Sequence, residues 1–444
     1  MQTIIFILAI LLTAINALGQ KDQVSPASYY EAAKWNTWMI ANPQEVKIAP
    51  PPDAAQSKIE IVTIRNSIAV LDDKKLAAIK YWDAGAPAYR WNQIAPKLIS
   101  WDKVDIVLRF PTAWMNMAIY DATVLAWKEK IKYKRSRPQV SDPMLQPAIL
   151  APLTYSYPCE HSVTAAAAAN VLAYFFPAIK DSILHLAKAA SQSRIDAGVQ
   201  FPSDVEAGWK LGEEVARQII EKAKNDGSAN KWEGAVNKDP KKWTGPYALG
   251  ITLLTHTPLV IQSADQFRPP PPPDFEKEMK EIKDFKPNFK STSLAYYWGN
   301  IPFEFWSDLA GRKIFETRLS DNAPAVARIY TIMHIASRDA ALATMDAKYA
   351  YWGIRPNQYD SSYKPMLQTP PFPGYPSGHA LGAGTASAVL EYFFPADAQQ
   401  FQQLAKDCAD SRFYAGIHFK TDNEVGLKMG RDIGKYVVET LMKK

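Results

Sequence analysis

The side chains best suited to chemistry lie in three short blocks of the second half of the chain, and the first block holds two cations. Lys348 and Arg355 are seven residues apart. On one continuous helix this spacing separates them by about 20° in direction and about 10 Å in height, so both would lie on one face. Pro356 is predicted to end that helix. Taken alone, two such cations also fit a solvated helix surface.

The second block is a turn that opens into a helix. Ser377, Gly378 and His379 follow a proline-rich turn and begin an Ala/Leu-rich stretch with helical periodicity. A helix N-terminus offers free N–H groups to an anion, Ser377 adds a hydroxyl, and Gly378 lets the backbone approach closely. His379 is the candidate general acid or base. Taken alone, this block is equally typical of a serine N-cap beside a partly exposed histidine.

The third block contains Arg412, His418 and Asp422. Gly416 is predicted to break one helix just before another starts, so that His418 leads a new turn. Asp422, four residues later, would lie against His418, fix its tautomer and raise the basicity of the other ring nitrogen. Alone, this pair also fits an ordinary helix surface. Together, the three blocks predict a pocket for a tetrahedral oxyanion, which arginine grips through two parallel hydrogen bonds.

The blocks fall in the second copy of an internal repeat. Residues 171–178 align with 389–396, and residues 157–161 with 375–379, at the same shift of 218 residues and without a gap. One shift shared by separate blocks indicates a duplication.

The first copy lacks the groups on which the chemistry would depend. Glu160 stands where the second copy has Gly378, and Gln200 stands where it has His418. A carboxylate repels an oxyanion, and an amide cannot replace an imidazole as nucleophile or metal ligand. We therefore expect the first copy to be a scaffold without an intact site. Its cations are expected to form ion pairs with Glu160 and its neighbours: Lys130, Arg137 and Arg194.

The elements that must position these blocks are helices. Stretches such as 377–394 and 422–442 have helical periodicity, and alternating strand patterns are almost missing. The sequence therefore predicts an all-α protein of two helical-bundle lobes. The expected divisions are an N-terminal lobe, a proline-rich connector and a C-terminal lobe with the site: 20–267, 268–290 and 291–444. The connector begins with a stiff polyproline run, for which an exposed recognition tract is the alternative.

Composition and the first residues limit the class of protein. With 47% hydrophobic and 22% charged residues, the 444-residue chain fits a globular protein. Residues 1–19 are typical of a cleaved export signal, which predicts a periplasmic or secreted protein; an uncleaved anchor is the alternative. No other stretch is apolar for long enough to span a membrane. The net charge of +6 favours anionic substrates but is spread along the chain, so nucleic acid is not implied.

Two cysteines, Cys159 and Cys408, are too few for a disulfide framework. Two buried thiols are expected, and a single bridge is the alternative. The sequence leaves the oligomeric state open.

The three blocks resemble the signature motifs of the superfamily of vanadium haloperoxidases and type 2 phosphatidic acid phosphatases (PAP2), in its soluble haloperoxidase-like branch. The residues that carry the resemblance are Lys348-x6-Arg355-Pro356, Pro376-Ser-Gly-His379 and Ser411-Arg412-x5-His418-x3-Asp422. The resemblance implies a catalytic set of His379, His418 and Asp422, with His418 as the only protein ligand to vanadium. It further implies that vanadate, or phosphate in its place, is bound by Lys348, Arg355, Ser377, Gly378, His379, Arg412 and His418.

The activity implied by the resemblance is that of a vanadium-dependent haloperoxidase, which oxidises halide with hydrogen peroxide. Residues 370–376, including Phe372, are similar to the corresponding stretch of fungal chloroperoxidases, whereas Ile354 and Met345 depart from that pattern. Two alternatives stay open. One is a secreted acid phosphatase that hydrolyses phosphate esters through a phosphohistidine, and the other is a non-enzymatic oxyanion-binding protein.

Overall fold

The computed structural model describes residues 30–99, 105, 108–299 and 303–443. The predicted export signal, residues 1–19, lies outside the described residues. Within them, all regular secondary structure is helical, which confirms the all-α prediction. None of the described helices combines the length and the apolar character that a membrane crossing requires.

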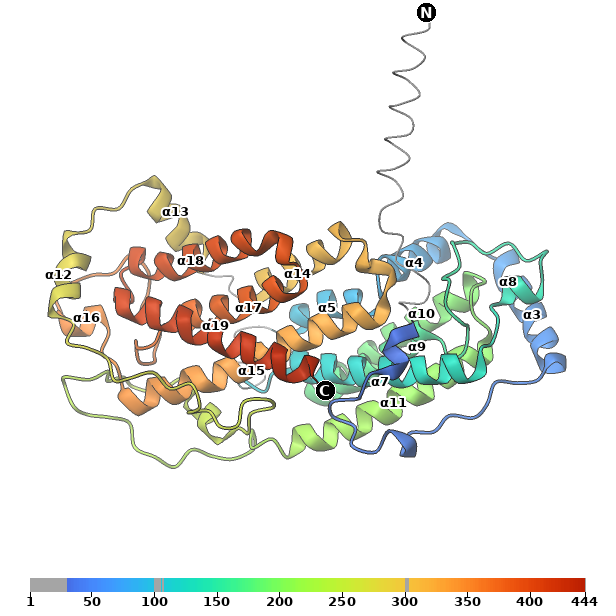
Figure 1. The fold of residues 1–444 in the computed structure, drawn as a ribbon, viewed down its shortest axis with the longest axis horizontal. Helices are drawn as coiled ribbons and strands as arrows, with labels where there is room; N and C mark the ends of the chain where they lie inside the picture. The colour runs from blue at the N-terminus through green and yellow to red at the C-terminus, as the bar shows by residue number, and fades with distance from the viewer. Residues whose placement is uncertain (1–29, 100–104, 106–107, 300–302, 444) are drawn as a thin grey trace, which may run out of the picture.

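Four long helices form the centre of the first half, drawn in cyan to green at the right of Figure 1. They are α7 (Pro111–Tyr133), α9 (Glu160–Phe175), α10 (Lys180–Asp196) and α11 (Pro202–Lys224). The second half, drawn in orange and red at the left, has the same series: α15 (Ala323–Tyr351), α17 (Gly378–Phe393), α18 (Ala398–Tyr414) and α19 (Lys420–Met442). The last three helices of each half begin and end at positions that differ by the same 218 residues.

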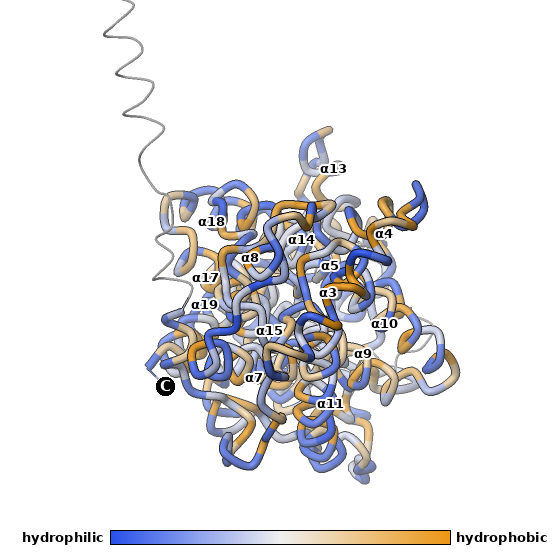
Figure 2. The backbone as a smooth tube through the Cα atoms, turned by 90° about the vertical axis from the view of Figure 1, so that its right-hand side faces the viewer, coloured by the Kyte–Doolittle hydropathy of each residue, from blue (hydrophilic) through white to orange (hydrophobic). Residues whose placement is uncertain are grey.

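Shorter helices surround these two sets. In the first half they are α3 (Ala54–Ala69), α4 (Asp73–Asp83), α5 (Pro87–Leu98) and α8 (Pro138–Ser141). In the second half they are α12 (Glu276–Asp284), α13 (Phe289–Tyr297), α14 (Phe303–Glu316) and α16 (Pro356–Tyr359). Hydrophilic and hydrophobic residues alternate along the surface helix α11 (Figure 2), as expected of an element with one face against the core.

A buried aspartate in the middle of each central helix fixes the chain segment beside it. Asp121 of α7 accepts hydrogen bonds from the backbone N–H groups of residues 38–40. Its counterpart Asp339 of α15 accepts them from residues 259–261. Burial raises the pKa of Asp121 to about 6, although the three N–H groups act in the opposite direction. Each carboxylate thus has the donors that burial of a charge requires.

The two halves share one hydrophobic core. α7 packs against α15, and Thr331 of α15 donates a hydrogen bond to the Asn116 carbonyl of α7 at 2.8 Å. Buried apolar side chains from both helices belong to one continuous cluster, among them Ile119 and Ile335. The halves are therefore fixed relative to each other by burial of apolar surface.

Close packing of α17 on α19 positions the second and third sequence blocks. A Cβ atom added at Gly430 of α19 would overlap the Leu381 carbonyl of α17, so only glycine allows this approach. At the start of the same pair of helices, the Ser377 N–H donates to the Asp422 carbonyl at 2.8 Å. The loop before α17 and the first turn of α19 are thus joined directly.

The proline-rich run lies along the second half. The hydroxyl of Tyr351 donates to the Pro269 carbonyl at 2.6 Å, and that of Tyr375 donates to the Pro270 carbonyl at 2.8 Å. Residues 268–290 also contain α12, whose carboxylates contact the first turn of α19.

Candidate active site

The end of α15 carries the first predicted site residue. Lys348 lies in the last turn of this helix, which ends at Tyr351 because Trp352 adopts a left-handed conformation, with φ of 53°. Arg355 follows in extended backbone as the N-cap of α16. The prediction that Lys348 and Arg355 share a helix ended by Pro356 is therefore wrong, since the chain turns away four residues earlier.

The ammonium group of Lys348 is fully buried and fixes the turn before α17. Its Nζ donates to the carbonyl oxygens of Pro373, Gly374 and Pro376 at 2.6, 2.9 and 2.6 Å. Burial lowers the pKa of Lys348 well below its usual value, and the positive charge of Arg355 adds to this effect. The cation is thus held next to the segment that contains Ser377.

Arg355 reaches the same place from the opposite side. Its Nε donates to the Phe372 carbonyl at 3.1 Å, and its Nη1 donates to the Ile417 carbonyl at 2.8 Å. The third nitrogen, Nη2, is buried and has no hydrogen-bond partner among the described residues. Burial lowers the pKa of Arg355 to about 10, so the group remains charged at neutral pH.

His418 stands between Arg355 and Asp422. Its Nε2 lies 2.8 Å from Nη1 of Arg355, and its Nδ1 lies 3.0 Å from Oδ2 of Asp422. A guanidinium can only donate, so Nε2 must accept and the ring proton is on Nδ1, directed at the carboxylate. Burial and the nearby cations lower the pKa of His418 well below its usual value, which keeps the imidazole neutral.

Asp422 is oriented by the start of α19. Its Oδ2 also accepts the N–H of Phe419 at 3.1 Å, at the N-terminus of the helix. Burial raises the pKa of Asp422 to about 7, although Arg355 and Lys348 act in the opposite direction. The structure thus places Asp422 against His418, as the four-residue spacing predicts.

The N-terminus of α17 carries the second block. Ser377 is the N-cap, with its hydroxyl accepting the Ala380 N–H at 3.5 Å. A Cβ atom at Gly378 would have Thr344 and Lys348 as its nearest neighbours, at 3.6 and 3.9 Å, so the glycine faces Lys348 across a gap of van der Waals size.

His379 is partly exposed, and its Nε2 has no hydrogen-bond partner among the described residues. Burial lowers the pKa of His379 to about 3, with further contributions from Arg412, Arg355 and Lys348. All three cations therefore act on this imidazole as well as on His418.

Arg412 completes the cluster from the end of α18. Its Nη2 donates to the Ala295 carbonyl of α13 at 2.9 Å, and its Nε donates to the Ser411 hydroxyl at 2.9 Å. Burial lowers the pKa of Arg412 to about 10. Sequence reasoning did not find Ala295, because a backbone carbonyl leaves no side-chain signal.

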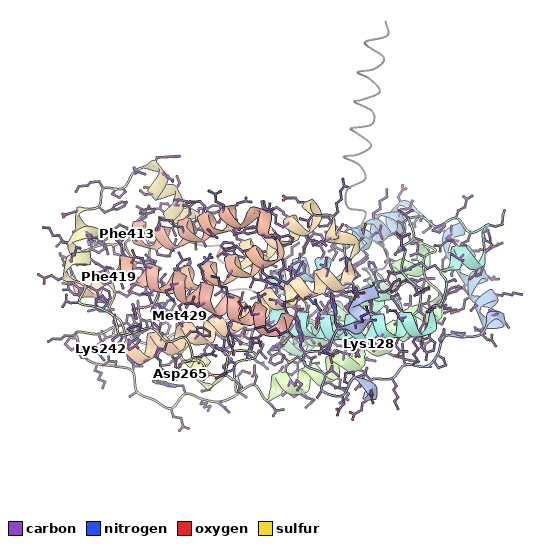
Figure 3. The ribbon with its side chains drawn as sticks, in the orientation of Figure 1. Lys128, Lys242, Asp265, Phe413, Phe419 and Met429 are labelled. Atoms are coloured by element: carbon purple, nitrogen blue, oxygen red, sulfur yellow. The ribbon has the colours of Figure 1, made fainter. Side chains whose placement is uncertain are left out.

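The cluster lies toward the outer end of the second half. Phe413 and Phe419, which follow Arg412 and His418 in the chain, lie together at the end of α18 and the start of α19 (Figure 3). The Phe372 ring centre is 5.1 Å from Nζ of Lys348 and 5.2 Å from Cζ of Arg355. An aromatic face thus covers two of the cations.

The positive charge of this site is not compensated by ion pairs. No carboxylate among the described residues lies within ion-pair distance of Lys348, Arg355 or Arg412. Buried charges normally have such partners. The predicted residues are thus brought together around unpaired positive charge, an arrangement suited to binding an anion; their individual roles stay predictions.

The first half behaves differently, as the ion-pair prediction requires. Glu160 pairs with Lys130 at 2.8 Å and with Arg137 at 2.9 Å. Arg194 pairs with Asp83 of α4 at 2.8 Å.

Both cysteines, Cys159 and Cys408, are buried free thiols, which confirms the expectation of no disulfide. Burial raises the pKa of each thiol to about 12, so neither is ionised at neutral pH.

The chain is similar to known proteins in both halves. Residues 396–444 match the family model of the second helical-bundle domain of VCPO, and residues 111–223 match that of the PAP2 superfamily. A solved bacterial vanadium-dependent iodoperoxidase is 24% identical with a TM-score of 0.60, over 89% of this chain and 98% of the other. A bacterial vanadium-dependent chloroperoxidase, solved in its holo form, is 15% identical with a TM-score of 0.58, over 77% and 92%. No curated protein sequence matches.

Proposed function

Because the chain belongs to the superfamily of vanadium haloperoxidases and PAP2 phosphatases, we propose that it is a vanadium-dependent haloperoxidase that oxidises halide with hydrogen peroxide. The observation that carries the proposal is the meeting of three buried cations, none with a carboxylate partner among the described residues, at the Nε2 side of a neutral histidine. Solved proteins described as vanadium-dependent iodo- and chloroperoxidases share this fold, which supports the proposal.

The donors present fit a small tetrahedral oxyanion such as vanadate. Nη2 of Arg355 and Nε2 of His379 are buried nitrogens that lack hydrogen-bond partners among the described residues. The hydroxyl of Ser377 and the backbone of Gly378 lie at a helix N-terminus, where N–H groups favour anions. These groups and Arg412 would hold the oxygens, and Nε2 of His418 would bind the vanadium.

Bound vanadate would supply a Lewis-acidic centre at which hydrogen peroxide becomes an oxidant for halide. The side chains of the protein would hold the charge and the protons. Asp422 would keep the His418 proton on Nδ1, so that Nε2 offers its lone pair to the site. His379, neutral beside the cations, would accept a proton from the incoming peroxide and return one to the leaving oxygen. The predicted export signal would place this reaction in the periplasm or outside the cell.

A phosphatase of the PAP2 type is the second candidate, and two observations favour it. Residues 111–223 match the PAP2 family model, and the unprotonated Nε2 of His418 could attack phosphorus as readily as it could bind a metal.

The test starts from purified protein freed of oxyanions. One set of assays supplies vanadate, hydrogen peroxide and chloride, bromide or iodide, and measures halogenation of an electron-rich dye. A parallel set supplies a chromogenic phosphate ester without peroxide. Halogenation that requires vanadate supports the proposal. Hydrolysis blocked by vanadate, without halogenation, selects the phosphatase, and neither activity points to an oxyanion-binding protein.

A matched pair of variants controls for damage to the fold. His379→Gln should lose activity, whereas His161→Gln changes the counterpart in the first half and should retain it. Equal loss in both variants would contradict the assignment of the site to the second half.

A further inference from the structure

The first half contains the same arrangement of donors, directed at a carboxylate of the chain itself. The Oε1 and Oε2 atoms of Glu160 accept from Arg137 Nη2 at 2.9 Å and from Lys130 Nζ at 2.8 Å. Nε2 of Gln200 approaches Oε2 at 3.3 Å. With the shift of 218 residues, the three donors correspond to the site residues Arg355, Lys348 and His418. Glu160 itself corresponds to Gly378.

The two guanidinium groups are held identically. Arg137 donates from Nε to the Thr154 carbonyl at 2.7 Å and from Nη1 to the Val199 carbonyl at 3.1 Å. Arg355 uses the same two nitrogens on the corresponding carbonyls of residues 372 and 417. The halves differ at Nη2, which donates to Glu160 in the first half and has no partner among the described residues in the second.

The two lysines show the same difference. Lys130 donates to the carbonyls of Tyr155 and Ser156, at 2.6 and 3.3 Å, and to Glu160. Lys348 donates to the two corresponding carbonyls and turns its third N–H to the Pro376 carbonyl. In the first half, therefore, one donor of each cation is directed at the same two carboxylate oxygens.

Glu160 is buried but ionised. Burial alone would raise its pKa, yet the charges of Lys130 and Arg137 outweigh this effect and hold the pKa of Glu160 below its usual range. A permanent anion of the chain thus neutralises the two cations that an exogenous oxyanion would otherwise compensate.

From this correspondence of atoms we infer that the first half retains an oxyanion pocket whose occupant is the Glu160 side chain. Its ligand class is that of phosphate and sulfate, which Glu160 excludes from the natural protein by filling their place. The first half therefore keeps its buried cations paired at all times and does not depend on an oxyanion for stability. The inference rests only on the first half and stands whether or not the second half has haloperoxidase activity.

The experiment removes the internal anion in two ways. Glu160→Gly recreates the residue of the second half and frees the space and the charge. Glu160→Gln keeps the volume but removes the charge, so it is the matched control. Sulfate binding is measured on the full chain by calorimetry, and thermal unfolding is followed in sulfate and in chloride at equal ionic strength.

We expect Glu160→Gly to bind one more sulfate per chain than the natural protein and than Glu160→Gln. Its Tm should fall in chloride and recover in sulfate by at least about 3 °C more than that of the natural protein. An unchanged number of sulfates would overturn the inference. Because the comparison counts one additional site, it does not depend on how many the second half binds.

A second measurement covers a Glu160→Gly protein that does not fold in chloride. Refolding from urea is then carried out in sulfate and in chloride. Recovery of folded protein in sulfate alone supports the inference, and failure in both salts, while Glu160→Gln refolds, overturns it.

Discussion

Nη1 of Arg355 lies 2.8 Å from Nε2 of His418, which makes the imidazole an acceptor toward the site and a donor toward Asp422. This relationship makes the planar shape of the guanidinium important, since one edge binds the imidazole and the Ile417 carbonyl while Nη2 remains for an anion.

We therefore expect Arg355→Lys to lower the affinity for sulfate or vanadate by about 10-fold or more, because an ammonium cannot replace the fork geometry. Calorimetric titration measures the affinity. Arg137→Lys is the matched control in the first half and should leave the affinity unchanged. Equal affinities of the Arg355→Lys and natural proteins would show that Nη2 does not contact the anion.

Asp422→Asn should reduce vanadate affinity and turnover by about 10- to 100-fold, the usual cost of removing the carboxylate that orients a metal-binding histidine. The amide keeps the shape but removes the charge that holds the proton on Nδ1 of His418. Vanadate titration and halogenation rates measure the two effects. Asp204→Asn changes the counterpart in the first half and should affect stability alone; loss of vanadate binding there would argue against a local role of Asp422.

Oxyanion binding should be linked to proton uptake. Burial and three cations lower the pKa of His379 to about 3, so the free site binds no proton there at neutral pH. A bound dianion favours the imidazolium and raises this pKa, so affinity should increase as the pH falls below about 6.5, the usual histidine value. Sulfate does not titrate in this range, which makes it the suitable probe.

Calorimetry of sulfate binding in two buffers with different ionisation enthalpies measures this uptake. The natural protein should take up a fraction of a proton that grows toward pH 5. His379→Gln should take up less, because it leaves only His418 to respond. Uptake that is zero, or unchanged in the variant, would exclude His379 as the responding group.

Side-chain spacing predicted those parts of the site that depend on local geometry. The Ser377 cap, the break at Gly416 and the contact of His418 with Asp422 each depend on a few consecutive residues, and the structure has all three. The repeat also predicted the identical bounds of α10 and α18.

Features set by tertiary packing were not predictable in the same way. The sequence places Lys348 and Arg355 on one helix, whereas Trp352, a bulky residue with φ of 53°, ends α15 between them. A left-handed conformation is uncommon in residues other than glycine, so no local preference indicates it. The carbonyls that receive Nζ of Lys348 and Nη2 of Arg412 are equally invisible, because every residue has a carbonyl.

The close approach of α17 and α19 gives a prediction that connects the scaffold to the site. Gly430→Ala places a methyl group against the Leu381 carbonyl, and the helices must separate to admit it. We expect the free energy of unfolding to fall by about 1–3 kcal/mol, the usual cost of overpacking. Urea unfolding measures this change, with the exposed Lys428→Ala on the same helix as its control.

The same substitution should weaken oxyanion binding, although Gly430 is remote from the anion. Separation of the helices strains the hydrogen bond from the Ser377 N–H to the Asp422 carbonyl, which joins the N-terminus of α17 to the segment that carries His418. A loss of sulfate affinity in Gly430→Ala, but not in Lys428→Ala, would support this coupling. A destabilised variant with unchanged affinity would show that the site keeps its geometry independently of how tightly the two helices pack.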